Sequence, residues 1–330
     1  GTKRLFLDRY IYSVFFFSLG GRHWVDKEGW VNASLPYCDW SGLNCDANVA
    51  GRVNTVQMER NNMTGTVPPE LAKVQFLRNV RLGSNPNMTG AFPPAILDQF
   101  ALRLLNIAFN GFEQPLADLV PTSPERSGLG QFLVEGNRFT GTIPSGFGQI
   151  TRLSNLELSD NRLTGTIPTE LGLMSNLERL AVGGNKLRGT LPTSLFGLRF
   201  LEELDVADNL LSGPLPITLE NAWQLFSLSL SQNNFTGVNR ARQFCDAPES
   251  GLEDMFIDCD DFENTDANGF CGDGSEQLLR DCDCVCSELE AQAGGPDGGV
   301  AKKGQRRGQA VPGTGNRRQV RGVRRAREKA

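Results

Sequence analysis

Histidine is nearly absent from this 330-residue chain, and His23 is the only one. Without a second histidine, a Ser/His/Asp or Cys/His arrangement for nucleophilic catalysis cannot be assembled. The sequence also lacks a Walker loop, a kinase signature and a dinucleotide-binding glycine motif. We therefore expect a protein that is not an enzyme and that needs no cofactor.

Long apolar runs are also missing. The longest uncharged stretch near the start of the chain covers only residues 10–21, whereas a membrane-spanning helix needs about 20 apolar residues. The chain begins with glycine and shows no signal peptide of the usual form. We interpret it as a fragment whose targeting segment lies upstream, and membrane attachment would require that missing segment.

Cysteine does not occur between residues 46 and 244 and is confined to two groups near the ends. Even numbers of cysteines at both ends are typical of disulfide-stapled caps in an oxidising compartment. The cysteines of Cys282-x-Cys284-x-Cys286 lie closer than paired zinc ligands usually do. The acidic run of residues 254–266 lacks the spacing of a calcium loop. We therefore predict disulfides and no metal site, with the partners in the second group undetermined. The two groups are Cys38 and Cys45, and then Cys245, Cys259, Cys271, Cys282, Cys284 and Cys286.

A repeat of about 24 residues dominates the middle of the chain. An asparagine recurs at spacings of 24, 25, 27, 24, 24, 24 and 24, and apolar residues stand eight, five and three positions before it. After it the chain usually reads as in Leu163–Pro168, LTGTIP. The apolar residues at minus five and minus three alternate with polar ones, which indicates a short strand with one buried face. Stacked coils of this kind bury a continuous core, and we expect the asparagine amide to pair backbone groups between coils. The eight asparagines are Asn61, Asn85, Asn110, Asn137, Asn161, Asn185, Asn209 and Asn233.

The pattern LxxLxLxxNxLTGxIPxxLxxL resembles the plant-type leucine-rich repeat of receptor-kinase ectodomains and polygalacturonase-inhibiting proteins. Trp24–Cys45 is similar to the amino-terminal cap of that family, and the resemblance implies a Cys38–Cys45 disulfide. The CDCVC run resembles the caps of algal and stramenopile leucine-rich-repeat proteins. The implied fold is an α/β solenoid, an L domain-like right-handed superhelix of about eight coils with a concave parallel sheet.

Four segments are expected from these patterns. Residues 1–52 form a helical cap, in which a helix bearing Tyr10 and Phe15–Phe17 is packed by Trp24, Trp30 and Trp40. Residues 53–239 form the repeats, with an irregular third coil at 111–128, and residues 240–290 form a cysteine-rich cap. Residues 291–330 form a disordered basic tail, since 301–330 hold eleven Lys/Arg against one Asp/Glu. Its arginine pairs could bind nucleic acid or anionic lipid, but no aromatics interleave them, and we favour a solvated tail.

Four N-x-Ser/Thr triplets, at Asn32, Asn62, Asn87 and Asn234, are candidate glycosylation sites. Together with the cysteine staples they favour a protein that is secreted or held at the cell surface.

The candidate binding surface is the outward face of the concave sheet. Leu104, Phe109 and Leu133 are expected to place apolar side chains outward beside the irregular coil, and carboxylates are expected to surround Arg179. An exposed apolar cluster rimmed by charge is typical of an interface centre. The alternative is that Phe109 tucks under its own insertion. The candidate residues are Arg81, Leu104, Phe109, Leu133, Glu157, Arg179, Glu203, Asp205 and Asp208.

We therefore predict a non-catalytic extracellular module that binds a protein, a peptide or a cell-wall glycan, as the ectodomain of a receptor-like protein would. One alternative is inhibition of a wall-degrading enzyme. Ice binding is another, because threonines stack at one repeat position, although Ala91 and Pro214 interrupt that column. An intracellular scaffold that binds nucleic acid through the tail is the last. The threonines are Thr66, Thr142, Thr166 and Thr190.

Overall fold

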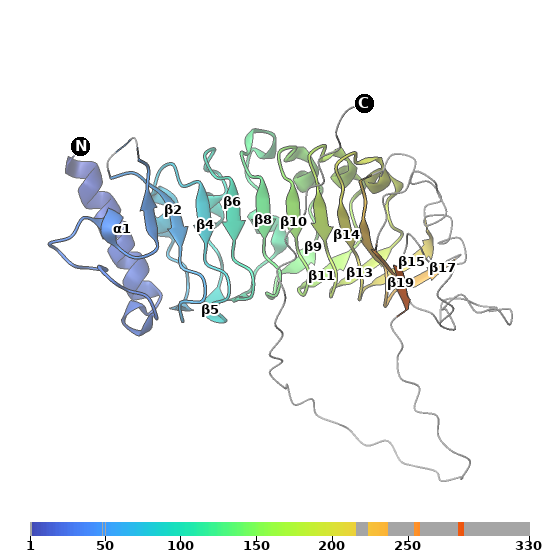
Figure 1. The fold of residues 1–330 in the computed structure, drawn as a ribbon, viewed down its shortest axis with the longest axis horizontal. Coiled ribbons are helices and arrows are strands. Elements are labelled where there is room, and N and C mark those ends of the chain that lie inside the picture. The colour runs from blue at the N-terminus through green and yellow to red at the C-terminus, as the bar shows by residue number, and fades with distance from the viewer. Residues whose placement is uncertain are drawn as a thin grey trace, which may run out of the picture. The chain divides into compact units, whose positions relative to one another are not determined.

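The computed structural model describes residues 2–47, 49, 51–215, 224–236, 254–257 and 283–286. These residues form a leucine-rich-repeat solenoid whose coils each contribute one strand to a long sheet (Figure 1). All pairings in this sheet are parallel except that of β1 with β2. Its strands, in spatial order, are β1 Leu43–Cys45, β2 Val53–Gln57, β4 Asn79–Arg81, β6 Leu104–Asn106, β8 Gln131–Leu133, β10 Asn155–Glu157, β12 Arg179–Ala181, β14 Glu203–Asp205, β16 Ser227–Ser229, β18 Asp254–Ile257 and β19 Asp283–Cys286.

A second strand later in the coils forms two further sheets, and the division between them falls after the third coil. One sheet has the order β3-β5-β7 and the other β17-β15-β13-β11-β9. Across this division an isolated bridge pairs Pro115 with Thr140, and the backbone N–H groups of Arg138 and Thr140 donate to the carbonyls of Phe112 and Gln114. The strands are β3 Thr64–Gly65, β5 Asn87–Gly90, β7 Gly111–Phe112, β9 Thr140–Thr142, β11 Arg162–Gly165, β13 Lys186–Gly189, β15 Leu210–Pro214 and β17 Asn234–Thr236.

The return side of the coils carries 3-10 helices, and α1 is the α-helix of the described chain. The prolines of the repeat motif start several of these turns, as Pro168 does before η8, because proline fixes an extended φ and needs no hydrogen-bond donor. The longer third coil holds two of them, η5 and η6. The 3-10 helices are η1 Gly21–His23, η2 Tyr37–Asp39, η3 Pro69–Lys73, η4 Pro94–Ile96, η5 Leu116–Leu119, η6 Pro124–Arg126, η7 Ser145–Gln149, η8 Thr169–Leu173 and η9 Thr193–Gly197.

Seven of the eight repeat asparagines are buried and Asn233 is partly buried, and their amides join consecutive coils, as the sequence predicts. In Asn185 the side-chain Nδ2 donates to the carbonyl of Leu158 in the preceding coil at 3.1 Å and to that of Val182 in its own coil at 3.0 Å. Its Oδ1 accepts from the backbone N–H of Leu163 at 3.0 Å. One amide therefore satisfies buried backbone groups of two coils, which explains why no shorter or apolar residue stands there.

The amino-terminal cap is built around α1, Thr2–Ser18. Its inner face buries Phe15 and Phe16 against Trp24 and Trp30, with ring centroids 4.9–6.0 Å apart. Cys38 and Cys45 are joined by a disulfide, as the family resemblance implies.

Two other aromatics of the helix do not join this packing. Tyr10 and Phe17 point to solvent, 56% and 60% exposed, because the buried stripe runs through Asp8, Ile11, Phe15 and Leu19 on the opposite side of the helix. Within the described residues, no helix is long and apolar enough to span a bilayer.

Candidate functional site

The strand register places the outward residues of successive coils in two straight columns on the long sheet. Arg179 lies between Asn155 and Glu203 in one column, and Ala181 lies between Glu157 and Asp205 in the other. The same register continues without a shift from β2 to β16. The two columns stand six and four positions before each repeat asparagine, on either side of the inward residue at minus five.

An ion-pair bridge spans three coils at the middle of this surface. The Arg179 guanidinium contacts the Glu157 carboxylate through Nε at 3.2 Å and the Glu203 carboxylate through Nη1 at 2.8 Å. Each partner comes from an adjacent coil, so the bridge depends on the 24-residue spacing. The charge of Arg179 is thereby matched, and the other carboxylates around it give the surface an excess of negative charge.

Glu135 belongs to this cluster, although it was not among the sequence candidates. It stands two positions before Asn137, and its carboxyl forms a hydrogen bond with that of Glu157. Burial raises the pKa of Glu135 above its usual value, and the charge of Glu157 raises it further. Burial also raises the pKa of Asp205, against the opposing effects of the Ala207 N–H and Arg179. Each carboxyl therefore holds its proton more tightly than in water.

The residue just before each repeat asparagine adopts a left-handed backbone, with φ between 51° and 64° in all eight coils. Glycine, aspartate and serine account for five of these positions, in keeping with their tolerance of this region. The other occupants include Phe109, a bulky residue at φ 55°. Sequence reasoning missed this column, and the recurrence of Gly and Asp at minus one was the available signal. The eight residues are Arg60, Ser84, Phe109, Gly136, Asp160, Gly184, Asp208 and Gln232.

Phe109 is half exposed and packs over the next coil. A Cβ added at Gly136 would lie 2.5 Å from Cδ1 of the Phe109 ring, so the ring occupies the space that the glycine leaves. Phe109 is 50% exposed, and the alternative that it tucks under its own insertion is not what the structure shows.

The remaining candidate binding residues differ in how far they are exposed. Leu104 is only 7% exposed, so the expectation that it offers an apolar side chain to a ligand was wrong. Its in-register neighbours Asn79 and Gln131 flank it on both sides and cover a short aliphatic side chain. Leu133 and Arg81 are partly exposed, and Asp208 is exposed. The structure thus brings together the Arg179 cluster and leaves Phe109 one coil before Glu135 and two coils before Glu157.

The four candidate glycosylation asparagines are all exposed. Asn62 donates from Nδ2 to the His23 carbonyl at 3.0 Å, and Asn32 accepts from the Ser34 N–H at 2.9 Å. Among the cysteines of the second group, Cys245, Cys259, Cys271 and Cys282 lie outside the described residues, as does the tail. Cys284 and Cys286 lie in β19. No group of three or more metal-ligating side chains occurs in the described part of the chain.

Comparisons with known proteins agree with this architecture. The model of the family "Leucine Rich Repeat" matches residues 152–174. Phytosulfokine receptor 1 of Arabidopsis thaliana is 30% identical over 98 residues, which are 29% of this chain and 9% of that protein. The ectodomain of the receptor kinase GASSHO1/SCHENGEN3 from Arabidopsis thaliana, solved with CASPARIAN STRIP INTEGRITY FACTOR 2, has a TM-score of 0.60 and 26% identity. That match covers 76% of this chain and 33% of the receptor chain.

A plant ice-binding protein is similar in fold, with a TM-score of 0.53 and 23% identity, over 69% of this chain and 79% of that one. The chain thus spans a small part of the curated relative and a third of the receptor ectodomain. The repeat, the parallel sheet with its asparagine ladder and these likenesses lead to one conclusion: the chain is a leucine-rich-repeat protein of the plant type.

Proposed function

We propose that this chain is a non-catalytic recognition module, secreted or displayed at the cell surface, that binds a peptide or an extended protein segment along the long sheet. The observation that carries the proposal is the Glu157–Arg179–Glu203 bridge, with the half-exposed Phe109 two coils before Glu157. These side chains do not serve the core, which consists of the inward residues of the same strands. The GASSHO1/SCHENGEN3 ectodomain supports the proposal because it was solved with a bound partner.

The dimensions of the surface suit an extended peptide. Phe109 belongs to the third coil and Glu203 to the seventh, and four steps of about 4.8 Å between strands give roughly 19 Å. An extended chain of about six residues, at about 3.3 Å each, covers this length. Phe109 offers a half-exposed ring for an apolar side chain. The excess carboxylates, Glu135 and Asp160 among them, favour a ligand that also carries a basic group.

Loss of a captured partner in a site-directed variant tests the proposal. The chain, expressed as a secreted protein, is used as bait against cell-surface and culture extracts, beside a Phe109→Ala, Arg179→Glu double variant. A matched control is Phe200→Ala with Arg199→Glu, because Phe200 is 47% exposed and both residues lie outside the sheet, between η9 and β14. We expect a partner that the wild type and the control retain and the double variant loses by at least tenfold, about 1.4 kcal/mol.

A partner held equally by all three proteins would place binding elsewhere. If the captured partner is a wall-degrading enzyme whose activity falls on binding, the module acts as an inhibitor. Ice binding is tested separately by thermal hysteresis. Its basis is the exposed threonines at the repeat position of Thr142 and Thr166. The sheet that carries these threonines ends at β9 and does not continue into the third coil.

A further inference from the structure

The outer face of α1 is apolar although nothing in the described chain covers it. Its most exposed side chains are Phe6, Tyr10 and Phe17, at 76%, 56% and 60%. Their spacings of four and seven residues place them on one side of the helix, opposite the buried stripe of Asp8, Ile11 and Phe15. A helix that is apolar on both sides is expected to be covered on both sides.

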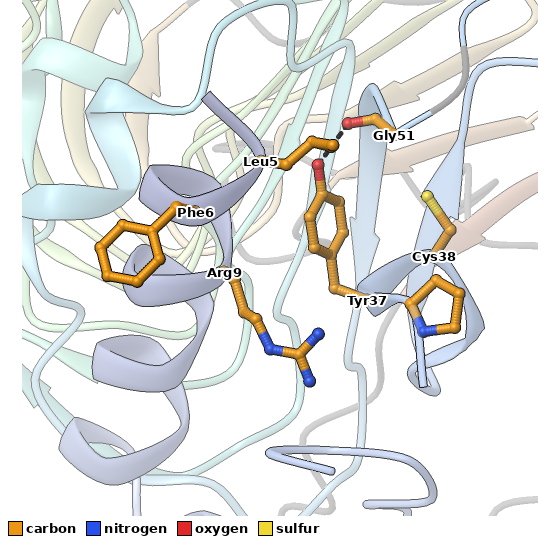
Figure 2. A pocket seen from close by; sticks show the side chains of 7 residues that line it. Leu5, Phe6, Arg9, Tyr37, Cys38 and Gly51 are labelled. Atoms are coloured by element: carbon orange, nitrogen blue, oxygen red, sulfur yellow. Dashed lines mark hydrogen bonds between the residues drawn. The ribbon is translucent and has the colours of Figure 1, made fainter. Parts of the chain in front are cut away.

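An apolar cavity of about 420 Å³ extends this surface beside the first half of the helix. Figure 2 shows Leu5, Phe6 and Arg9 projecting from α1 on one side of it, and Tyr37 opposite, hydrogen-bonded to the Gly51 carbonyl. The apolar area therefore continues from the aromatic stripe onto the loop that holds Tyr37.

The net charge of α1 limits the kinds of partner that can bind its outer face. Thr2–Ser18 contains Lys3, Arg4 and Arg9 against Asp8, which leaves a net charge of +2. The carboxylate of Asp8 is turned inward, where it contacts Arg4 at 3.7 Å, and burial raises its pKa. Arg9 donates to the neutral carbonyls of Asn32 and Leu35 and lies over the Trp40 ring, 5.1 Å from its centroid, and it forms no ion pair among the described residues.

From these observations we propose that the outer face of α1 binds an anionic lipid surface. Protruding phenylalanine and tyrosine rings flanked by arginine are the composition of an interfacial helix, in which rings enter the headgroup region and cations meet anionic lipid. A second copy of this chain would bring two faces of net positive charge together. An acidic helix of another protein would satisfy the charge, but the rings protrude from a convex helix, which fits a bilayer better than a helical partner.

Co-flotation with vesicles tests this directly. The full chain is mixed with phosphatidylcholine vesicles, with or without phosphatidylserine, and compared with the triple variant Phe6→Ser, Tyr10→Ser, Phe17→Ser. Phe100→Ser is the matched control, since Phe100 is 69% exposed and lies beyond the cap. Because the basic tail also attracts anionic vesicles, all proteins carry glutamine in place of its paired arginines. These are Arg306, Arg307, Arg317, Arg318, Arg324 and Arg325.

We expect the wild-type helix to float with phosphatidylserine vesicles and to bind neutral vesicles at least tenfold more weakly. The triple variant should lose at least tenfold in affinity, and Phe100→Ser should not. Each of the three single variants removes one exposed ring and should lose two- to threefold in affinity for phosphatidylserine vesicles. These single variants test the proposal if the triple variant folds poorly. Equal flotation of wild type and variants overturns the proposal, as does no flotation of the wild type. Light scattering that shows a dimer dispersed by the triple variant would assign the face to a second copy instead.

Discussion

Replacing Asn185 by alanine removes one amide from the ladder, and the structure gives the expected cost. In this variant the backbone N–H of Leu163 loses its acceptor, Oδ1 of Asn185. No other acceptor for this N–H is found among the described hydrogen bonds. A buried N–H left unpaired costs about 1–3 kcal/mol. The carbonyls of Val182 and Leu158 each keep a second donor, from Asn209 and Asn161, so their loss is smaller, about 0.5–1 kcal/mol together. The sum is about 1.5–4 kcal/mol.

The matched control is Asn176→Ala. Asn176 is exposed, and its single bond to the Thr151 carbonyl is 2.7 Å long and open to water, so its loss should cost no more than about 1 kcal/mol. Urea unfolding followed by far-ultraviolet circular dichroism measures both. If Asn176→Ala and Asn185→Ala shift the midpoint by the same amount, the asparagine ladder does not stabilise the coils in the way described here.

Two further predictions concern a carboxyl and a pair of glycines. Because burial raises the pKa of Glu135 in the folded state, its contribution to stability is present below the usual value of 4.5 and is lost as pH rises through the raised value. Glu135→Gln should therefore be more stable than wild type near neutral pH and equal to it below pH 4.5, as urea midpoints at the two conditions will show; a gain that persists in acid would contradict this cause. A Cβ at Gly148 would lie 2.2 Å from the backbone oxygen of Glu170, whereas one at Gly197 meets nothing within 4 Å. Gly148→Ala should cost about 1–3 kcal/mol and Gly197→Ala should gain about 0.4–1 kcal/mol; similar melting temperatures for the two variants would refute the clash.

Much of the fold follows from the sequence because the repeat period determines the register. Once strands are spaced by 24 residues, the neighbours of Arg179 are necessarily Asn155 and Glu203, and the amide of each repeat asparagine meets the preceding coil. Position along a strand gives the side on which a residue lies, but not how far its neighbours cover it. This is why Leu104 was misjudged and why Glu135 was missed, since both depend on the sizes of side chains in adjacent coils.

The buried side of α1 could not be identified from the sequence, for a different reason. Apolar residues occupy both sides of α1, so hydrophobicity could not tell Phe15, which is buried, from Phe17, which is not. The buried Asp8 added to the difficulty, because a carboxylate is usually taken as a sign of the solvent side.

The division of the second set of strands after the third coil has a mechanical consequence. The long sheet runs unbroken through this coil, while on the other side of the solenoid β7 and β9 belong to separate sheets, joined by one isolated bridge and by the backbone hydrogen bonds from Arg138 to Phe112 and from Thr140 to Gln114. Because the described coils on either side of this joint are linked by full strand pairs and the joint is not, we expect the solenoid to bend more easily there. A peptide that reaches from Phe109 to Glu203 would cross this joint, and its binding would change the bending stiffness of the solenoid there.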